Sequence, residues 1–249
     1  MTLVLSIVMP AYNEEDCIEK VVDNWTDFLK RKFPNEATTL IVINDGSKDR
    51  TGELLNAMAP TNSHLTVVNQ PNGGHGNAVV NGYRKAVELQ SQYVFQTDSD
   101  DQFVTEDFEK LWDKRKESRF ILVYREIRHD ASVRLFITRV LRGTISAVYG
   151  TYILDSNIPF RLIEGNFLRK LLQQLPDPVP FAPNIFLAVM AKKSGQKLFD
   201  IPITHKDRET GTVSIVKWNL FKVSVRSFRE LLRFRIDLND KVKALRSNT

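Results

Sequence analysis

The first hundred residues repeat one pattern four times: an apolar run typical of a buried strand, followed by polar or glycine-containing residues. The apolar runs lie within 3–12, 38–47, 65–71 and 91–100, and amphipathic stretches within 14–30, 49–59 and 76–89 separate them. Such alternation of strands and helices predicts a mostly parallel sheet with helices on both faces. In an α/β fold of this kind, ligands bind at the carboxyl ends of the strands.

Each of the four predicted strands ends in residues that suit a binding site. The endings are PAYNEED at 10–16, NDGSKD at 44–49, NQPNGGHGN at 69–77 and TDSDDQ at 97–102. Because the carboxyl ends of parallel strands meet at one edge of the sheet, we expect the four loops to face one another. A single loop of this composition has little meaning, but four at one edge predict a site.

The fourth loop places three carboxylates within four positions, at Asp98, Asp100 and Asp101. On an extended chain Asp98 and Asp100 share one face, and Asp101 lies opposite. Hard oxygen ligands at this spacing suit a divalent cation that keeps several waters and is completed by substrate phosphates. An isolated D-x-D is more often a solvated acidic turn. Its position after a central strand, beside a glycine-rich loop, favours the metal.

The glycine-rich loop and the second strand ending suit the rest of a phosphorylated ligand. Gly73, Gly74 and Gly76 lead into a predicted helix, so the main chain can approach a phosphate at the helix N-terminus. The loop matches neither a Walker motif nor G-x-G-x-x-G. Asp45 can accept hydrogen bonds from a ribose or base, although Asn-Asp-Gly-Ser is also strong turn chemistry. Around 13–15, a helix N-cap with acidic first-turn residues is the alternative.

Arginines accumulate after about residue 113, where the strand–helix alternation stops. Guanidinium groups bind phosphates through paired hydrogen bonds, but most charge runs are solvated faces, so we expect one or two of these arginines to matter. They are Arg125, Arg128, Arg134, Arg139 and Arg142. A proline-rich break at 173–183 and a late strand within 196–205 follow.

The composition narrows the class of protein. A hydrophobic content of 42% and a charged content of 26% are typical of a soluble globular chain. Cys17 is the only cysteine, which excludes an internal disulfide and favours a reducing compartment. No stretch has the length of a transmembrane helix, and the N-terminus lacks a secretory signal. The net charge of +5 suits an anionic partner, but no nucleic-acid-binding module is present, so we expect no nucleic acid.

The segment 217–249 reads as a basic amphipathic helix. Leu220, Phe221, Val225, Phe228, Leu231 and Leu232 fall near one helical face, and Lys222, Arg226, Arg229 and Arg233 fall on or beside the other. Such a helix can lie in the interface of an anionic membrane. The same periodicity suits an ordinary helix that packs its apolar stripe on the domain, and periodicity does not separate the two.

Taken in order, six motifs resemble those of family 2 glycosyltransferases with the GT-A fold. They are SIVMPAYNEE, VINDGSKDRT, NGGHGNAVVNG, DSDDQ, DSNIPFRL and IPITHKDRETGTVS. The resemblance is strongest to the polyprenyl-phosphate branch, typified by dolichyl-phosphate mannose synthase, and extends to about residue 217. It implies a catalytic domain at 1–216 and a membrane-associating helical segment at 217–249.

The resemblance also implies an activity. It is the metal-dependent, inverting transfer of a sugar from a UDP- or GDP-sugar to a polyprenyl phosphate, with Mg²⁺ or Mn²⁺ as the metal. The enzyme would be cytoplasmic and peripheral on the cytoplasmic face of a membrane, docked directly or through a membrane-anchored partner.

Individual residues acquire roles from the same resemblance. The donor nucleotide would be bound by Pro10, Ala11, Tyr12, Glu14, Asp45, Gly74 and Asp98, and the metal by Asp98, Asp100 and Gln102. Asp100 and Asp155 would be catalytic, with Asp155 either ordering the site or acting as a base. Donor or acceptor phosphates would contact Arg125, Arg134, Arg161 and Arg208. Pro159 and Asp200 depart from the family pattern, which affects the acceptor side.

Two other functions stay open on the sequence. One is a soluble family 2 transferase that adds sugar to a hydroxyl of a glycan or small molecule, which would need a carboxylate base. The other is a catalytically silent scaffold that binds a sugar nucleotide. A phosphate acceptor, by contrast, is already ionised at neutral pH and can attack without a base.

Overall fold

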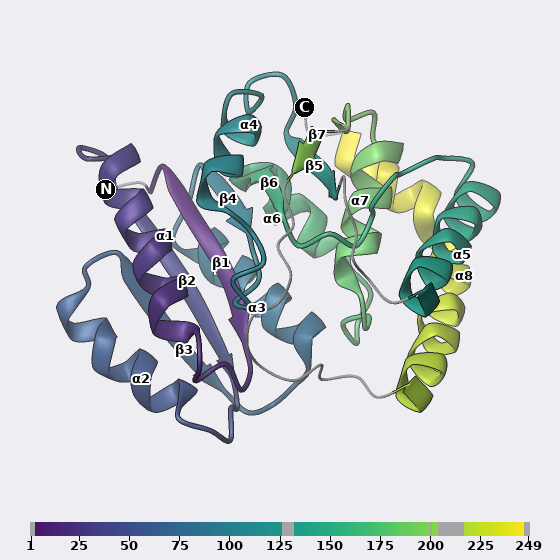
Figure 1. Cartoon of the computed structure of the whole chain (residues 1–249). Coiled ribbons are helices and arrows are strands. Elements are labelled where there is room, and N and C mark those ends of the chain that lie inside the picture. The colour runs from purple at the N-terminus through teal and green to yellow at the C-terminus, as the bar shows by residue number, and fades with distance from the viewer. Residues whose placement is uncertain (1–2, 126–131, 200, 204–216, 247–249) are drawn as a thin grey trace.

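A seven-stranded sheet forms the centre of the protein (Figure 1). The computed structural model describes residues 3–125, 132–199, 201–203 and 217–246, with the backbone alone for 132–137 and 217–225. In these residues the strand order is β3-β2-β1-β4-β6-β5-β7. The strands are β1 (Leu5–Ala11), β2 (Thr38–Asp45), β3 (Leu65–Gln70), β4 (Tyr93–Gln96), β5 (Phe120–Arg125), β6 (Arg161–Glu164) and β7 (Ile201–Ile203).

The first four strands are parallel, as the apolar runs predict. β1 pairs with β2 on one side and with β4 on the other, and β2 pairs with β3. Every residue of β1 and β2 is buried, which is typical of parallel strands covered on both faces. The pairing brings the carboxyl ends of these strands to one edge of the sheet.

The second half of the sheet contains an antiparallel strand that the sequence analysis does not predict. β6 runs antiparallel to both β4 and β5, and β5 pairs with β7 in parallel. Neither β5 nor β6 stands out in the sequence, because β5 lies in the arginine-rich segment and β6 has four residues and begins with Arg161. The sheet is therefore mostly, rather than wholly, parallel.

Helices cover both faces of the sheet (Figure 1). The helices are α1 (Ile18–Lys32), α2 (Thr51–Met58), α3 (His75–Glu88), α4 (Phe108–Trp112), α5 (Ser132–Tyr149), α6 (Gly165–Gln173), α7 (Pro183–Lys193) and α8 (Lys217–Arg246), with 3₁₀ turns η1 (Ala59–Thr61) and η2 (Thr105–Asp107). α1 and α2 pack together in front of β2 and β3 in this view, and α3 packs behind, against β1, β2, α6 and α7. α3 lies close to the sheet because a Cβ at Gly82 would come within 2.3 Å of Val8.

The C-terminal helix α8 packs on the rest of the protein along one side. It lies beside α5 and α7 at one end of the sheet (Figure 1). Its buried side chains belong to the same hydrophobic core as the sheet and are Leu231, Phe234, Leu238, Val242 and Leu245. The hydroxyl of Tyr149, at the end of α5, donates to the Leu231 carbonyl at 2.6 Å. Among the described residues, no helix combines the length and apolar character needed to cross a membrane.

Candidate active site

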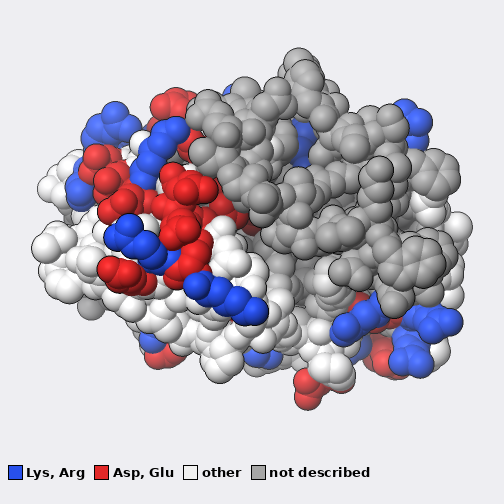
Figure 2. All heavy atoms as spheres, turned by 60° about the horizontal axis from the view of Figure 1, so that its bottom comes forward, with Lys and Arg blue, Asp and Glu red and all other residues white. Residues whose placement is uncertain are grey.

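The loops after β1, β2, β3 and β4 meet at one edge of the sheet, as their positions in the sequence predict. Main-chain or side-chain hydrogen bonds join the first loop to the second, the second strand to the third loop, and the first loop to the fourth. This edge lies towards the bottom of Figure 1, and Figure 2 shows acidic side chains gathered on that face. A site at this edge must therefore offset negative charge or bind a cation.

The first loop is fastened to the second through Asn13. Its N–H donates to the Ser47 hydroxyl at 3.1 Å, and its side-chain carbonyl accepts from the Lys48 N–H at 2.8 Å. Asn13 has φ of 54°, a left-handed conformation that asparagine tolerates better than most residues. The Glu14 N–H donates to the Thr51 hydroxyl at 2.8 Å. These bonds hold Tyr12 and Glu14 beside the end of β2.

Asp49 strengthens the same loop-to-loop contact. Its carboxylate accepts from the N–H groups of Glu15, at 3.1 Å, and Thr51, at 3.0 Å. Burial alone would raise the pKa of Asp49, but hydrogen bonds from the Thr51 hydroxyl and from the main chain outweigh it and lower the pKa. Asp49 is not among the site residues expected from the sequence, although an aspartate two residues before a threonine at a helix start is a recognisable capping pattern.

Asp45 shapes the glycine-rich loop. Its carboxylate is 3% exposed and accepts from Gln70 Nε2 at 2.7 Å, from the Gly73 N–H at 2.8 Å and from the Gly74 N–H at 2.9 Å. Gln70 is the residue paired with Asp45 across β2 and β3. Both carboxylate oxygens are thus used within the protein. The expected contact with a ribose or base stays a prediction, and the observed bonds give Asp45 the role of ordering the loop before α3.

The three carboxylates in the turn after β4 do not share one environment. Asp98 and Asp100 are partly exposed, and the Gln102 N–H donates to Asp100 Oδ1 at 3.4 Å. Asp101 has φ of 55° and pairs with Lys20 of α1 at 2.6 Å. The Cys17 thiol lies 3.3 Å from the Ser99 carbonyl and 3.5 Å from Glu14 Oε2, so the turn and Glu14 are close neighbours.

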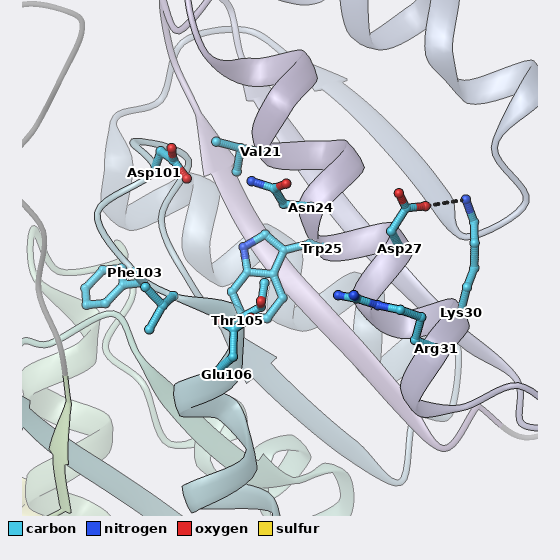
Figure 3. A pocket seen from close by; sticks show the side chains of 11 residues that line it. Val21, Asn24, Trp25, Asp27, Lys30, Arg31, Asp101, Phe103, Thr105 and Glu106 are labelled. Carbon is cyan, nitrogen blue, oxygen red and sulfur yellow. Dashed lines mark hydrogen bonds and ion pairs between the residues drawn. The ribbon is translucent and has the colours of Figure 1, made fainter.

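A groove of about 530 Å³ opens on the other side of this turn, between α1 and 101–106 (Figure 3). Asp101 lies at one end, and the Lys30–Asp27 ion pair lies at the other. Trp25 lies between them. Neither Asp98 nor Asp100 lines this groove, so it is distinct from the surface that would hold a metal.

The donor set at the turn fits a divalent cation of the Mg²⁺ or Mn²⁺ type. Asp98 and Asp100 would supply carboxylates, and Gln102 would supply an amide oxygen. Within the described residues, no three His, Cys, Asp or Glu side chains gather into a group able to hold a metal. Two carboxylates suit a cation whose remaining ligands are waters and substrate phosphates.

Arg125 and Asp155 form an ion pair at the far side of the same edge. Arg125 Nε lies 2.9 Å from Asp155 Oδ2, and Nη2 lies 3.2 Å from Oδ1. The side chains are 16% and 6% exposed. Arg125 ends β5, and Asp155 lies in the segment between α5 and β6, so the pair joins two elements that are far apart in the sequence. A carboxylate that accepts two hydrogen bonds from Arg125 is better suited to orienting the arginine than to accepting a proton.

Arg161 corrects one expectation of the sequence analysis. Its side chain is fully buried, and the guanidinium donates to the main-chain carbonyls of Ile158, Ser156 and Asn184. Burial lowers the pKa of Arg161, and Tyr83, Asp155 and Asp98 act in the opposite direction. In this position the guanidinium is not presented to a ligand's phosphate. The phosphate contact was implied by the family resemblance, and the sequence does not show which carbonyls surround the side chain.

A second buried polar residue lies beside Arg161. Tyr83 of α3 donates its hydroxyl to Gln96 Oε1 at 2.6 Å, and Gln96 is paired with Arg161 across β4 and β6. Burial raises the pKa of Tyr83 well above its usual range. Asp98 lies close enough to Tyr83 and Arg161 to influence the pKa of both.

The structure therefore brings together most of the expected site residues. Pro10 and Ala11 are buried at the end of β1, and Tyr12 and Glu14 follow them at the edge. The side chain of Arg134 and the residues Arg128 and Arg208 lie outside the part of the chain that the structure describes.

Comparisons with known proteins identify the family. The model of the family "Glycosyl transferase family 2" matches residues 6–183. A curated relative, a dolichyl-phosphate beta-glucosyltransferase (ALG5D) of Trichomonas vaginalis, is 27% identical over 94% of this chain and 75% of its own length. An undecaprenyl-phosphate 4-deoxy-4-formamido-L-arabinose transferase of Edwardsiella ictaluri is 22% identical over 83% of this chain. The chain spans 61% of the length of that second relative.

Solved structures agree on the fold. Glucosyl-3-phosphoglycerate synthase from Mycobacterium tuberculosis, in complex with Mn²⁺ and UDP-glucose, superposes with a TM-score of 0.67 at 18% identity, over 93% of this chain and 79% of that one. Mannosyl-3-phosphoglycerate synthase from Rubrobacter xylanophilus gives 0.63 at 13% identity, over 96% and 75%. These likenesses confirm the predicted GT-A fold, and the family match confirms the resemblance found in the sequence. The chain belongs to glycosyl transferase family 2 and is a glycosyltransferase with the GT-A fold.

Proposed function

We propose that this glycosyltransferase moves a sugar, with inversion, from a nucleotide-sugar donor to a polyprenyl phosphate. The observation that carries the proposal is the meeting of the D-x-D turn, the Asp45-ordered glycine loop and the Arg125–Asp155 pair at one edge of the sheet. The names of the two curated relatives, both transferases to a polyprenyl phosphate, support the acceptor class.

The donor would bind along the first two loops. Pro10, Ala11 and Tyr12 would line the pocket for the base and ribose, with Glu14 beside them. The hydrogen bonds through Asn13 and Asp49 hold this wall in place before the donor arrives. The N–H-rich start of α3, behind Gly74, faces the same edge and would favour the diphosphate's negative charge. The donor would be a UDP-sugar or a GDP-sugar, with uracil or guanine as its base.

A Mg²⁺ or Mn²⁺ ion would be held by Asp98, Asp100 and Gln102. When bound, such an ion stabilises the charge that develops on the leaving diphosphate. The buried cation of Arg161 lies close enough to Asp98 and Asp155 to interact with both charges electrostatically, which helps to keep the floor of the site in one arrangement.

On the acceptor side, Arg125 would bind the lipid phosphate. Asp155 orients its guanidinium by two hydrogen bonds, so less conformational entropy is lost when the phosphate binds. The acceptor phosphate needs no general base, which agrees with an Asp155 that is already committed to Arg125. Arg134 and Arg208 stay proposed phosphate contacts on the strength of the sequence resemblance.

A lipid acceptor implies that the enzyme works at a membrane. We propose that the segment 217–249 provides a peripheral contact with the cytoplasmic face, alone or together with a membrane-anchored partner. The high content of lysine and arginine in this segment supports an anionic surface as the contact.

The proposal is tested by offering the purified protein a panel of UDP- and GDP-sugars with Mn²⁺ or Mg²⁺ and a short polyprenyl phosphate. Mass spectrometry should detect a sugar-phosphate-lipid whose formation is lost in Asp100→Ala. Donor hydrolysis without a lipid product would favour a soluble transferase with a hydroxyl acceptor. Binding of donor and metal with no donor consumed would favour the silent scaffold.

A further inference from the structure

The C-terminal helix has two apolar faces rather than one. The first is buried against α5 and α7 and contains Leu231, Phe234 and Leu238. The second contains Phe228, Leu232 and Ile236, spaced four residues apart and therefore on one side of the helix. These three side chains are 44%, 43% and 79% exposed. The sequence analysis placed Leu231 and Leu232 on the same face, and the structure assigns them to different ones.

We propose that the outer face of α8, formed by Phe228, Leu232 and Ile236, is a docking surface for an anionic lipid bilayer. The inference deepens the proposed function and rests on it, since a polyprenyl-phosphate acceptor places the enzyme at a membrane. It also removes an ambiguity in the sequence: the helix packs on the domain through one face and offers the other to the bilayer.

The charges beside this face fit an anionic surface. Arg229 precedes Leu232 by three positions, and Arg233 precedes Ile236 by three, so both arginines border the apolar stripe. Both are exposed, and within the described residues neither forms an ion pair. Together with Arg226 and Lys241 they line a groove of about 890 Å³ next to the proline-rich segment, large enough for lipid headgroups.

Acidic groups on and around α8 do not cancel this charge. Glu230 is engaged by Arg226 at 2.8 Å and by the Phe181 N–H at 3.1 Å. Asp177 and Asp237 also line the groove, and Asp240 lies one turn further on, near Lys243. Over 217–246 there are nine lysines and arginines against three acidic residues, whereas the whole chain has a net charge of only +5. The positive excess of the protein is therefore concentrated in α8.

The size of the apolar stripe favours a membrane over a second copy of the chain. Three side chains four residues apart span about 12 Å of helix, whereas a stable protein interface buries about 800 Å² on each partner. A shallow apolar stripe with arginines at its border is sufficient for a helix in the plane of the interface. The packed inner face, tied down by the Tyr149–Leu231 bond and by Arg235 on the Val148 carbonyl, keeps the stripe turned outward.

The test measures binding of the full chain to vesicles of phosphatidylcholine and to vesicles of an equal mixture of phosphatidylcholine and phosphatidylglycerol. The variant Phe228→Gln/Leu232→Gln/Ile236→Gln should lose on the order of tenfold or more of its affinity for the mixed vesicles. Arg229→Gln/Arg233→Gln should lose about tenfold on the mixed vesicles and little on neutral ones. The matched control, Arg84→Gln/Lys116→Gln, removes the same charge from exposed sites outside α8 and should bind as the unchanged protein does.

A second measurement covers the case in which the triple variant does not fold. An environment-sensitive dye on Leu232→Cys should shift its emission to the blue when anionic vesicles are added, and the same dye on Lys116→Cys should not. Cys17 is buried, so the introduced thiol is the one that labels.

Three results would overturn the inference. They are vesicle binding by the triple variant equal to that of the unchanged protein, a dye at position 232 that does not respond, and concentration-dependent dimers that the triple variant abolishes. Sugar transfer to a short acceptor in detergent is measured in parallel, and all the variants should retain it. If the unchanged protein binds the vesicles but transfers no sugar, the result would count against the proposed function and leave the docking surface in place.

Discussion

The neighbouring carboxylates in the turn after β4 have different surroundings. Asp101 turns away in a left-handed conformation and pairs with Lys20. Asp98 and Asp100 remain at the edge where Glu14 and the glycine loop lie. A difference of one position in the sequence therefore separates a residue in an ion pair from a proposed metal ligand, and this difference can be tested with matched variants.

Asp100→Ala should reduce sugar transfer roughly a hundredfold or more, because the donor diphosphate loses a metal ligand. Asp101→Asn is the control: it removes the same charge, and asparagine tolerates a positive φ. Its transfer rate should stay within about threefold, because an exposed ion pair contributes little. Initial rates at saturating donor and Mn²⁺ give the comparison. Equal losses of transfer rate in the two variants would show that the rate depends on the total negative charge of the turn and not on a D-x-D metal site.

The structural role of the buried Arg161 side chain can be separated from a role in ligand binding. Arg161→Met should lower the free energy of unfolding by about 3 kcal/mol or more, because it leaves several buried carbonyls without a donor. Arg161→Lys should recover part of that loss. Chemical denaturation without ligands measures both. A ligand-contacting arginine would behave differently: the methionine variant would keep its stability and would raise only the KM for the acceptor.

At the scale of elements, the first half of the fold is predictable from the sequence, and the second half is predictable only in part. The late strand within 196–205 and the helix within 217–249 appear as β7 and α8, whereas β5 and β6 do not stand out in the sequence. Continuous apolar runs, amphipathic spacing and turn residues predict β1 to β4 and α1 to α3. β6 is four residues long and begins with an arginine whose burial depends on the distant Asn184 carbonyl. The outward face of α8 is equally hidden, because α5 and α7 determine which of its two apolar stripes is buried.

The same division applies to the site. Asp98 and Asp100 are predicted as metal ligands because their D-x-D spacing follows a central strand and lies beside a glycine-rich loop. Asp49 and Gln70 were missed because each acts through main-chain or side-chain groups of another loop. The role of Asp45 as a support for Gly73 and Gly74 likewise depends on the register of β2 against β3.

The contact between the first and second loops should show a characteristic pH dependence. The folded-state pKa of Asp49 is lowered, so the stabilisation from its hydrogen bonds is present above the unfolded value of 3.8 and is lost as the pH falls through the folded-state pKa. The stability difference between the unchanged protein and Asp49→Asn should therefore be constant near neutral pH and should shrink below about pH 4. Denaturation curves recorded from pH 7 downwards measure it. A difference that grows on acidification would contradict the assigned hydrogen bonds.

At the scale of the whole molecule, the two functional surfaces lie on one continuous body. The hydrophobic core that supports β1 and β4 also includes the inner face of α8. α8 is tied to the end of α5, and the segment after α5 carries Asp155. A helix docked on a bilayer would thus hold the acceptor side of the site in a fixed position relative to the lipid surface.

The most direct test of the account compares two acceptors that differ by one phosphate. The unchanged protein is given its donor, Mn²⁺ and either a short polyprenyl phosphate or the corresponding polyprenol, and the glycosylated lipid is quantified by mass spectrometry. The phosphate should be glycosylated, and the alcohol should give no detectable product, because the Asp155 carboxylate is hydrogen-bonded to Arg125 and is not available to activate a hydroxyl. Comparable product from the alcohol, or product from the alcohol alone, would contradict a site built around an ionised phosphate acceptor.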